Sequence, residues 1–153
     1  MPSQLIIRPV ARTDYAQWLP LWDGYNAFYG RAGATALPEA NTQATWSRFF
    51  APAEAMHCLV AEQDGRLVGL AHYLFHRSMI AIEPVCYLQD LFTVPETRGR
   101  GIGRALIEAV EAKARDAKSS RLYWHTHETN TTAQLLYDKL AEKSGFIVYR
   151  KLF

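Results

Sequence analysis

Residues 98–104 read Arg-Gly-Arg-Gly-Ile-Gly-Arg, and they separate an apolar run at residues 85–94 from an amphipathic stretch at residues 103–118. Glycines let a backbone turn tightly, and the first turn of a helix carries free N–H groups and the positive end of the helix dipole. Together these features favour an anion such as a phosphate group. Three arginines add positive charge at the same point. The segment therefore predicts a strand, a glycine-rich turn and a helix that bind phosphate.

Two common phosphate-binding patterns do not match this turn. The dinucleotide pattern G-x-G-x-x-G, counted from Gly99, requires a glycine where the chain has Arg104, and the P-loop requires a Gly-Lys-Ser/Thr that the chain lacks. The pattern R-x-x-G-x-G does fit, with Arg98, Gly101 and Gly103 in place. In this segment the chain resembles the GNAT superfamily of acyl-CoA-dependent N-acyltransferases. In that superfamily the corresponding segment wraps the pyrophosphate of coenzyme A.

The length and composition are those of one globular domain. A chain of 153 residues with 49% hydrophobic and 21% charged residues is typical of a folded protein of ordinary domain size. We therefore expect a single domain over residues 1–153. The formal net charge of +2 is too small to indicate a nucleic-acid partner.

The sequence contains no signal for a membrane or a metal. The N-terminus lacks the basic start and apolar core of a signal peptide, and no apolar run approaches the roughly 20 residues of a membrane span. Cys58 and Cys86 lie in separate apolar runs without C-x-x-C spacing, which indicates buried thiols rather than metal ligands or a disulfide. We expect a cytoplasmic protein without a metal cofactor or a membrane partner.

The periodicity of apolar residues predicts the order of helices and strands. Strands are expected at residues 5–8, 56–63, 66–75, 85–94, 121–126 and 146–153, and helices from residue 15, at residues 40–50, at residues 103–118 and at residues 131–143. Asp64-Gly65 is a favoured hairpin turn between two of the strands. Pro20 is expected to kink or restart the first helix, and Asn130 is expected to cap the last one.

This order predicts an α/β fold with a central mixed, mostly antiparallel sheet and helices on both faces. It is the order of the GNAT fold, and the resemblance covers nearly the whole chain. Family members commonly carry two strands after the last helix, whereas this chain has one run, at residues 146–153. Because an unpaired strand edge invites pairing, we expect a second subunit to cover or complete this edge in a homodimer.

The resemblance implies acetyl-CoA as the acyl donor. The backbone of Leu91, Phe92 and Thr93 would pair with the pantetheine arm where two parallel strands splay apart, and a backbone N–H of the same strand would stabilise the oxyanion. The residues expected to bind the cofactor are Leu91, Phe92, Thr93, Arg98, Gly99, Arg100, Gly101, Ile102, Gly103, Arg104 and Asn130. A buried strand without a ligand would explain the apolar residues of this strand equally well.

Tyr137 is the expected general acid. The segment from Asn130 to Tyr137 resembles the N-x-x-A-x-x-x-Y segment of the family at full spacing, which is two helical turns. A tyrosine holds its proton at neutral pH and could give it to a poorly solvated thiolate. The alternative is a core aromatic residue, because Ala133 and Leu136 lie on the same apolar helix face.

The general base is less well defined. Polyamine acetyltransferases carry Glu-Asp at the strand position that this chain fills with Gln89-Asp90. An amide cannot accept the proton, so Gln89 would only position the amine or a water. Asp90 is the remaining carboxylate, but strand alternation sends it to the opposite face from Gln89 unless a bulge intervenes. Proton loss through ordered water, or an amine of low pKa, is the alternative.

Four histidines are weaker candidates for the base, although their pKa lies near the working pH. His72 and His76 lie two residues apart on one expected strand, and His125 and His127 lie two apart near another. That spacing is what any half-exposed strand gives. We therefore expect ordinary strand residues, with His125 and His127 slightly better placed.

The amine is expected to enter over the first two helices. Tyr25, Phe28, Tyr29 and Arg31 are the candidates for the acceptor wall, where aromatic faces can attract a cation. The stretch from Leu122 through Tyr137 resembles the branch that acetylates histones and polyamines.

The resemblance implies transfer of an acetyl group to a primary amine, of a small molecule or of a peptide or protein lysine, by direct attack in a ternary complex. The first alternative is a non-catalytic module that binds acyl-CoA as a sensor, because Gln89 stands where an acid would help. The second is a nucleotide-binding protein that uses the glycine-rich turn.

Overall fold

The computed structural model describes residues 3–153, which contain one five-stranded sheet in the order β1-β2-β3-β4-β5. The strands are β1 (Leu5–Pro9), β2 (Met56–Gln63), β3 (Arg66–His76), β4 (Val85–Thr93) and β5 (Leu122–Tyr123). The first four pair in antiparallel fashion, and β5 lies parallel to β4. The predicted mixed, mostly antiparallel sheet is confirmed.

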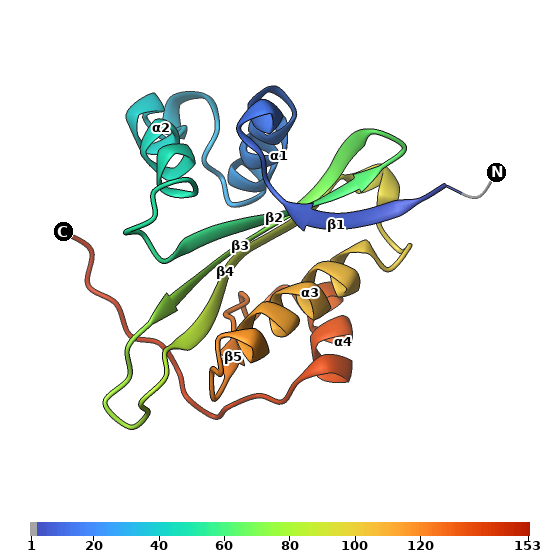
Figure 1. Ribbon diagram of the computed structural model, residues 1–153. Coiled ribbons are helices and arrows are strands. Elements are labelled where there is room, and N and C mark those ends of the chain that lie inside the picture. Colours follow the sequence, from blue (N-terminus) through green and yellow to red (C-terminus); the bar gives the residue numbers. More distant parts are fainter. Residues whose placement is uncertain (1–2) are drawn as a thin grey trace.

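Helices cover both faces of this sheet, as predicted. They are α1 (Tyr15–Phe28), α2 (Glu39–Arg48), α3 (Ile102–Asp116) and α4 (Thr131–Leu140), with short 3-10 turns at Arg12–Asp14, Gly33–Thr35 and Pro95–Thr97. Figure 1 shows α1 and α2 on one face and α3 and α4 on the other. The sheet therefore separates two apolar cores.

Alternation along the strands sends neighbouring side chains into different cores. Leu59 of β2 packs with Leu106 and Val110 of α3, whereas Val60 packs with Trp18 of α1. Leu106, Val110, Val60 and Trp18 are fully buried. Both cores depend on the two-residue period of the strands, because a shift by one residue would exchange their side chains.

The hairpin between β2 and β3 has the geometry that its sequence predicts. Asp64 and Gly65 both have positive φ angles, 52° and 78°. Two consecutive residues of this kind match the right-handed twist of the flanking strands. The turn therefore sets the register of the central strand pair.

Pro20 was predicted to kink or restart the first helix; the restart was wrong, because α1 runs through Pro20 from Tyr15 to Phe28, and the kink stays a prediction. A proline removes one backbone hydrogen bond from a helix. Trp18, Trp22 and Tyr25 pack as a stack on the buried face, with ring centroids 6.0 Å and 5.6 Å apart along the series. This tertiary packing holds the helix together across the proline.

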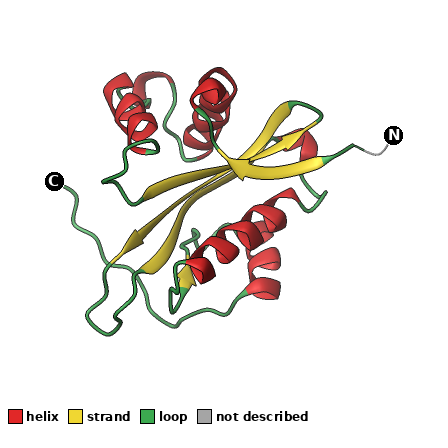
Figure 2. Cartoon of the chain, viewed as in Figure 1, coloured by secondary structure: helices red, strands yellow, loops and turns green. Residues whose placement is uncertain are grey.

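The end of the chain also differs from the prediction. β5 is limited to Leu122–Tyr123, α4 ends at Leu140, and residues 146–153 form no strand. Figure 2 shows this tail as an extended loop that leaves the body of the protein. All of residues 141–153 are exposed. A strand needs an edge to pair with, and residues 141–153 pair with no strand of the described sheet.

Cys58 and Cys86 are buried and free, as predicted. Within residues 3–153, no helix has the length and apolar character needed to cross a membrane. The single domain over residues 1–153 and the cytoplasmic location stay predictions.

Candidate functional site

An opening lies between β4 and β5 because the two strands pair only over a short distance. Cys86 pairs with Leu122 and Tyr87 with Tyr123, after which β5 ends while β4 continues to Thr93. The rest of β4 keeps its antiparallel partner β3 on the other side. The backbone of β4 beyond Tyr87 is therefore available to a ligand on the side of the opening.

A cavity of about 750 Å³ occupies this opening. It is lined by α1, by the end of β4, by the glycine-rich turn and by α4. The predicted site residues in its wall are Tyr25, Phe28, Tyr29, Leu91, Phe92, Thr93, Arg98, Gly99, Gly101, Ile102, Gly103, Arg104, Asn130 and Tyr137. Gln89, Asp90 and Arg100 do not line it, and the last of these is exposed.

Sequence reasoning missed several residues of this wall. They are Thr97, Thr132, Ala133, Leu135, Leu136 and Lys139. Five of the six belong to α4 and follow Asn130, so the helical period counted from Asn130 to Tyr137 could have identified them. Thr97 is buried and its hydroxyl donates to the Val94 carbonyl at 2.9 Å, which closes the turn before Arg98.

The N-terminus of α3 presents free backbone donors to the cavity. The first helical hydrogen bond runs from the Ala105 N–H to the Gly101 carbonyl at 3.0 Å, and no side chain caps this end. The N–H groups of Ile102, Gly103 and Arg104 precede that bond and have no intrahelical partner. They give the mouth of the cavity a partial positive charge.

The glycines of the turn fit a bound diphosphate. Gly99 and Gly101 have φ angles of 81° and 80°, which are strained for residues with a β-carbon. Among the described residues 3–153, a β-carbon at either position would meet nothing within 4 Å, so open space lies in front of both. The turn can therefore accept a phosphate close to its backbone, as the sequence predicts.

Arg98 and Arg104 lie at the rim of the cavity, where neighbouring residues hold their guanidinium groups. The Nε of Arg98 donates to the Thr93 carbonyl at 3.3 Å, and its guanidinium lies over the Phe92 ring, 5.7 Å from the centroid. Arg104 pairs with Glu108 at 2.9 Å. Both arginines keep positive charge beside the free end of α3.

Tyr137 faces the cavity from α4. Its ring packs edge-on against Trp124, with centroids 5.5 Å apart. Burial, with a smaller effect from Tyr29, raises the pKa of Tyr137 above its usual value. The hydroxyl therefore stays protonated at neutral pH. The predicted cap of α4 is confirmed, since the Asn130 side chain accepts from the Ala133 N–H at 3.4 Å.

A bulge in β4 decides where Asp90 points. His72 of β3 lies opposite Asp90, but the next residue of β3, Tyr73, lies opposite Leu88. Gln89 is therefore the extra residue of the bulge, and it is exposed. Asp90 turns to the α1 face of the sheet, where it is 6% exposed.

His72 is not the half-exposed strand residue that its spacing predicts. It is 5% exposed, its Nδ1 lies 2.9 Å from Oδ2 of Asp90, and its Nε2 accepts from the Trp18 indole at 3.1 Å. The other three histidines are more exposed, and His125 lies 3.2 Å from the Tyr87 hydroxyl. No local sequence pattern could have identified His72, because its two partners lie far away in the chain.

A positive charge lies beside the acceptor wall. The Arg31 guanidinium is 5.9 Å from the centroid of Tyr25 and 5.5 Å from that of Tyr29. Its Nε donates to the Asn26 side chain at 2.7 Å. The aromatic faces expected to attract a cationic substrate are therefore partly used by Arg31.

Comparison with known proteins relates this arrangement to acyl transfer. Residues 18–141 match the acetyltransferase (GNAT) family. The D-amino-acid N-acetyltransferase HPA3 of Saccharomyces cerevisiae is 31% identical over 97% of this chain and 91% of that protein. The thialysine N-epsilon-acetyltransferase of Mus musculus is 32% identical over 61% of this chain and 62% of its own length.

Solved structures share the fold. An aminoglycoside N-acetyltransferase, AAC(6')-Iy in complex with CoA, superimposes with a TM-score of 0.76 at 24% identity, covering 99% of this chain and 97% of the other. An integron cassette protein from the mobile metagenome of V. cholerae gives a TM-score of 0.80 at 22% identity, over 97% and 93% of the two chains.

Proposed function

This chain belongs to the acetyltransferase (GNAT) family of N-acetyltransferases, and from that premise we propose that it transfers an acetyl group from acetyl-CoA to a primary amine by direct attack in a ternary complex. One observation carries the proposal. One cavity joins the free end of α3, the open edge of β4 and the side of α4 that carries Tyr137. These are the groups needed to hold a thioester carrier and to protonate its thiolate.

The N-terminus of α3 holds the diphosphate of the donor. The N–H groups of Ile102, Gly103 and Arg104 point at it, and Arg98 adds charge from the rim. The exposed edge of β4 from Leu91 to Thr93 pairs with the amides of the pantetheine arm. A backbone N–H of the same edge donates to the developing oxyanion, which is typically worth about 3 kcal/mol of barrier.

Tyr137 protonates the leaving thiolate. Its raised pKa keeps the proton in place until the thiolate forms, and its position in the wall keeps it beside the donor. The amine nitrogen forms the new bond to the carbonyl carbon, the carbon–sulfur bond breaks, and the sulfur takes the Tyr137 proton. The proton that the nitrogen loses as it becomes an amide passes through water to the Tyr137 oxygen and restores the hydroxyl.

We further propose that the acceptor is an amine that carries a carboxylate, as an amino acid does. Arg31 supports this choice, because its guanidinium lies beside Tyr25 and Tyr29, which line the cavity, and Asn26 binds its Nε. The two terminal nitrogens can bind a carboxylate. The yeast relative named for D-amino acids is consistent with it. Lysine side chains and polyamines are the competing acceptors.

Release of free thiol from acetyl-CoA tests the reaction. The wild-type protein is incubated with acetyl-CoA and D-amino acids, L-amino acids, polyamines, an aminoglycoside or a lysine peptide. We expect thiol release with amino acids. Amino-acid amides, in which the carboxylate is replaced by a neutral carboxamide, should give a lower kcat/KM. Arg31→Gln should reduce this preference about tenfold or more by removing a charged hydrogen bond. Binding of acetyl-CoA without release by any amine would favour the sensor.

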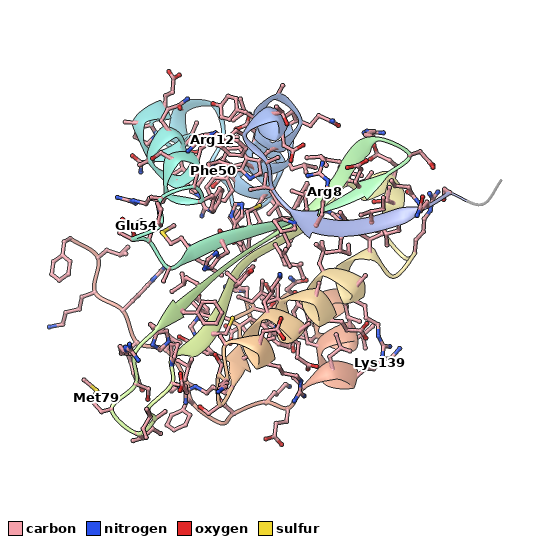
Figure 3. The ribbon with its side chains drawn as sticks, viewed as in Figure 1. Arg8, Arg12, Phe50, Glu54, Met79 and Lys139 are labelled. Carbon is pink, nitrogen blue, oxygen red and sulfur yellow. The ribbon has the colours of Figure 1, made fainter. Side chains whose placement is uncertain are left out.

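We also propose that the protein is a homodimer. Two segments expose apolar side chains that a monomer rarely leaves in water. On the C-terminal tail these are Phe146, Ile147, Val148, Tyr149, Leu152 and Phe153, and on the β3–β4 hairpin they are Met79, Ile80 and Ile82. Figure 3 shows Met79 pointing away from the body at the hairpin tip. A second copy can cover both and can pair with the open edge of β5.

Sedimentation of the wild-type protein and of a variant that ends at residue 143 tests the dimer. We expect a dimer at micromolar concentration for the wild type and a folded monomer for the variant. Circular dichroism serves as the folding control. A clean wild-type monomer would contradict the proposal.

A further inference from the structure

Two buried aspartates have very different surroundings. Asp14 and Asp90 are both 6% exposed. Arg8 donates to both carboxylate oxygens of Asp14, at 2.7 Å and 3.0 Å, and lowers the pKa of that carboxyl. Within residues 3–153, Asp90 pairs with no lysine or arginine, and its ion-pair contact is His72 at 2.9 Å. Asp14 has the surroundings of a structural carboxylate, and Asp90 does not.

The partners of His72 determine where its proton sits. The Trp18 indole can only donate, so the Nε2 of His72 must accept and carries no hydrogen. In a neutral imidazole the hydrogen is then on Nδ1, which donates to Oδ2 of Asp90. Trp18 therefore fixes the tautomer of His72, and His72 fixes the orientation of Asp90.

Tyr25 connects this buried group to the cavity. It lines the cavity wall, and burial together with the neighbouring Asp90 carboxylate raises its pKa well above the usual value. Such a hydroxyl is protonated at neutral pH. The Tyr25 ring stacks on Trp22, with centroids 5.6 Å apart, and the Trp22 ring lies 5.1 Å from that of His72, the partner of Asp90. Tyr25 lines the cavity and Asp90 does not, which makes Tyr25 the link between an amine in the cavity and the buried carboxylate.

This inference rests on the proposed function. We propose that Tyr25 and Asp90 together take the proton of the acceptor ammonium, with His72 as the positioning residue for the carboxylate. The N–H bond of the ammonium breaks as its proton passes to the oxygen of Tyr25, while the Tyr25 proton passes to Asp90. The nitrogen lone pair released in this way attacks the thioester. After the product leaves, the proton passes from Asp90 back through Tyr25 to water in the cavity.

This proton path from the ammonium through Tyr25 to Asp90, called the relay below, supplies the base that Gln89 cannot provide. The titratable groups that face Asp90 are Tyr25 from α1, His72 from β3, Cys58 from β2 and Tyr87 from its own strand. None of the four is a lysine or an arginine, and Trp18 donates to the Nε2 of the imidazole. The Arg31 guanidinium lies over the Tyr25 ring, 5.9 Å from its centroid, and its charge lowers the pKa of Tyr25, against the effect of Asp90.

The pH dependence of kcat/KM separates this relay from a structural role. Three variants, Tyr25→Phe, Asp90→Asn and His72→Leu, are compared with the wild type on an amine of ordinary pKa. We expect Asp90→Asn and Tyr25→Phe to lower kcat/KM about 100-fold near pH 7. The loss should shrink as the pH approaches the pKa of the amine in solution, because the amine then needs no base. Hydrazine gives up its proton at a lower pH than an ordinary alkylamine does, so at the same pH its reaction should lose less.

Two further variants make the test specific. His72→Asn keeps an N–H near the position of Nδ1 and should recover most of the rate that His72→Leu loses. Asp14→Asn is the matched control, because it removes a buried carboxylate of equal exposure outside the cavity. It should lower stability without changing the pH profile. Acetyl-CoA binding should be unchanged by His72→Leu and Asp90→Asn.

A loss that is equal at every pH, and equal for hydrazine and ordinary amines, would overturn the relay and leave these residues structural. A variant pH profile identical to that of the wild type would overturn it as well. Failure of the proposed function is a different result, in which the wild-type protein itself releases no thiol with any amine.

Discussion

Gly24 of α1 and Phe92 of β4 approach so closely that a β-carbon on residue 24 would lie 2.8 Å from Cζ of the Phe92 ring. Phe92 lines the cavity, and Arg98 lies over its ring. The missing side chain at residue 24 therefore lets α1 pack against β4 while Phe92 keeps its place in the wall. The contact couples the packing of α1 to the shape of the donor site.

Gly24→Ala should raise the KM for acetyl-CoA severalfold. The new methyl group must push the tip of the Phe92 ring, and that ring can move into the cavity. Alanine in a helix interior is about 1 kcal/mol better than glycine, which offsets much of the strain. We expect a melting temperature within a few degrees of wild type, and steady-state kinetics that show the change in KM. An unchanged KM would mean that Phe92 does not contact the donor.

Tyr137→Phe should lower kcat and leave the affinity for acetyl-CoA nearly intact. The ring still packs on Trp124, but the proton donor to the thiolate is lost. General acid catalysis typically contributes about 100-fold or more. Thiol release measures kcat, and calorimetry measures affinity. Equal turnover of the variant and the wild type would remove Tyr137 from the mechanism.

The pKa of Tyr137 also predicts the alkaline limit of the reaction. Burial raises that pKa above 10, so the protonated form persists to higher pH than in a free tyrosine. Activity should therefore not fall through loss of this proton until the pH exceeds about 10. A pH–rate profile on an amine already deprotonated by pH 9 isolates this limb. A decline near pH 8 that is absent in Tyr137→Phe would contradict the assignment.

The Arg8–Asp14 pair should make stability depend on acid pH. Arg8 lowers the pKa of Asp14 in the folded protein, so the pair stabilises the fold fully above the unfolded pKa of about 3.9. The contribution is lost as the pH falls through the folded pKa. We expect Asp14→Asn to lower the free energy of unfolding by about 1 to 3 kcal/mol at pH 7. Urea titrations should show this difference shrinking as the pH falls below the unfolded pKa.

Much of the fold could be predicted because local chemistry decides it. Asp64-Gly65 supplies two positive φ angles and specifies the hairpin. The apolar residues of α3 recur at helical spacing, which predicts the buried face of that helix. Asn130 caps α4 as its residue type predicts. In each case the partners lie within a few residues of one another, so the sequence pattern contains the whole interaction.

The rest depends on contacts between distant residues. The bulge at Gln89 is visible only once β3 and β4 are paired, and it decides which face receives Asp90. The burial of His72 depends on Trp18, far away along the chain. Residues 146–153 have the composition of a strand, but strand formation also needs an available edge. These features were therefore open or wrong at the level of sequence.

Calorimetric titration of acetyl-CoA tests the central claim, that the N-terminus of α3 binds the diphosphate of the donor. We predict one saturable site per chain in the wild-type protein and binding at least about tenfold weaker in Gly103→Ala, because the new methyl group blocks close approach of a phosphate. The variant should fold normally, since a β-carbon at residue 103 would meet only Cδ2 of Leu136, at 3.9 Å. Absence of heat with the wild type at millimolar acetyl-CoA, or equal affinity of the two proteins, would contradict the account.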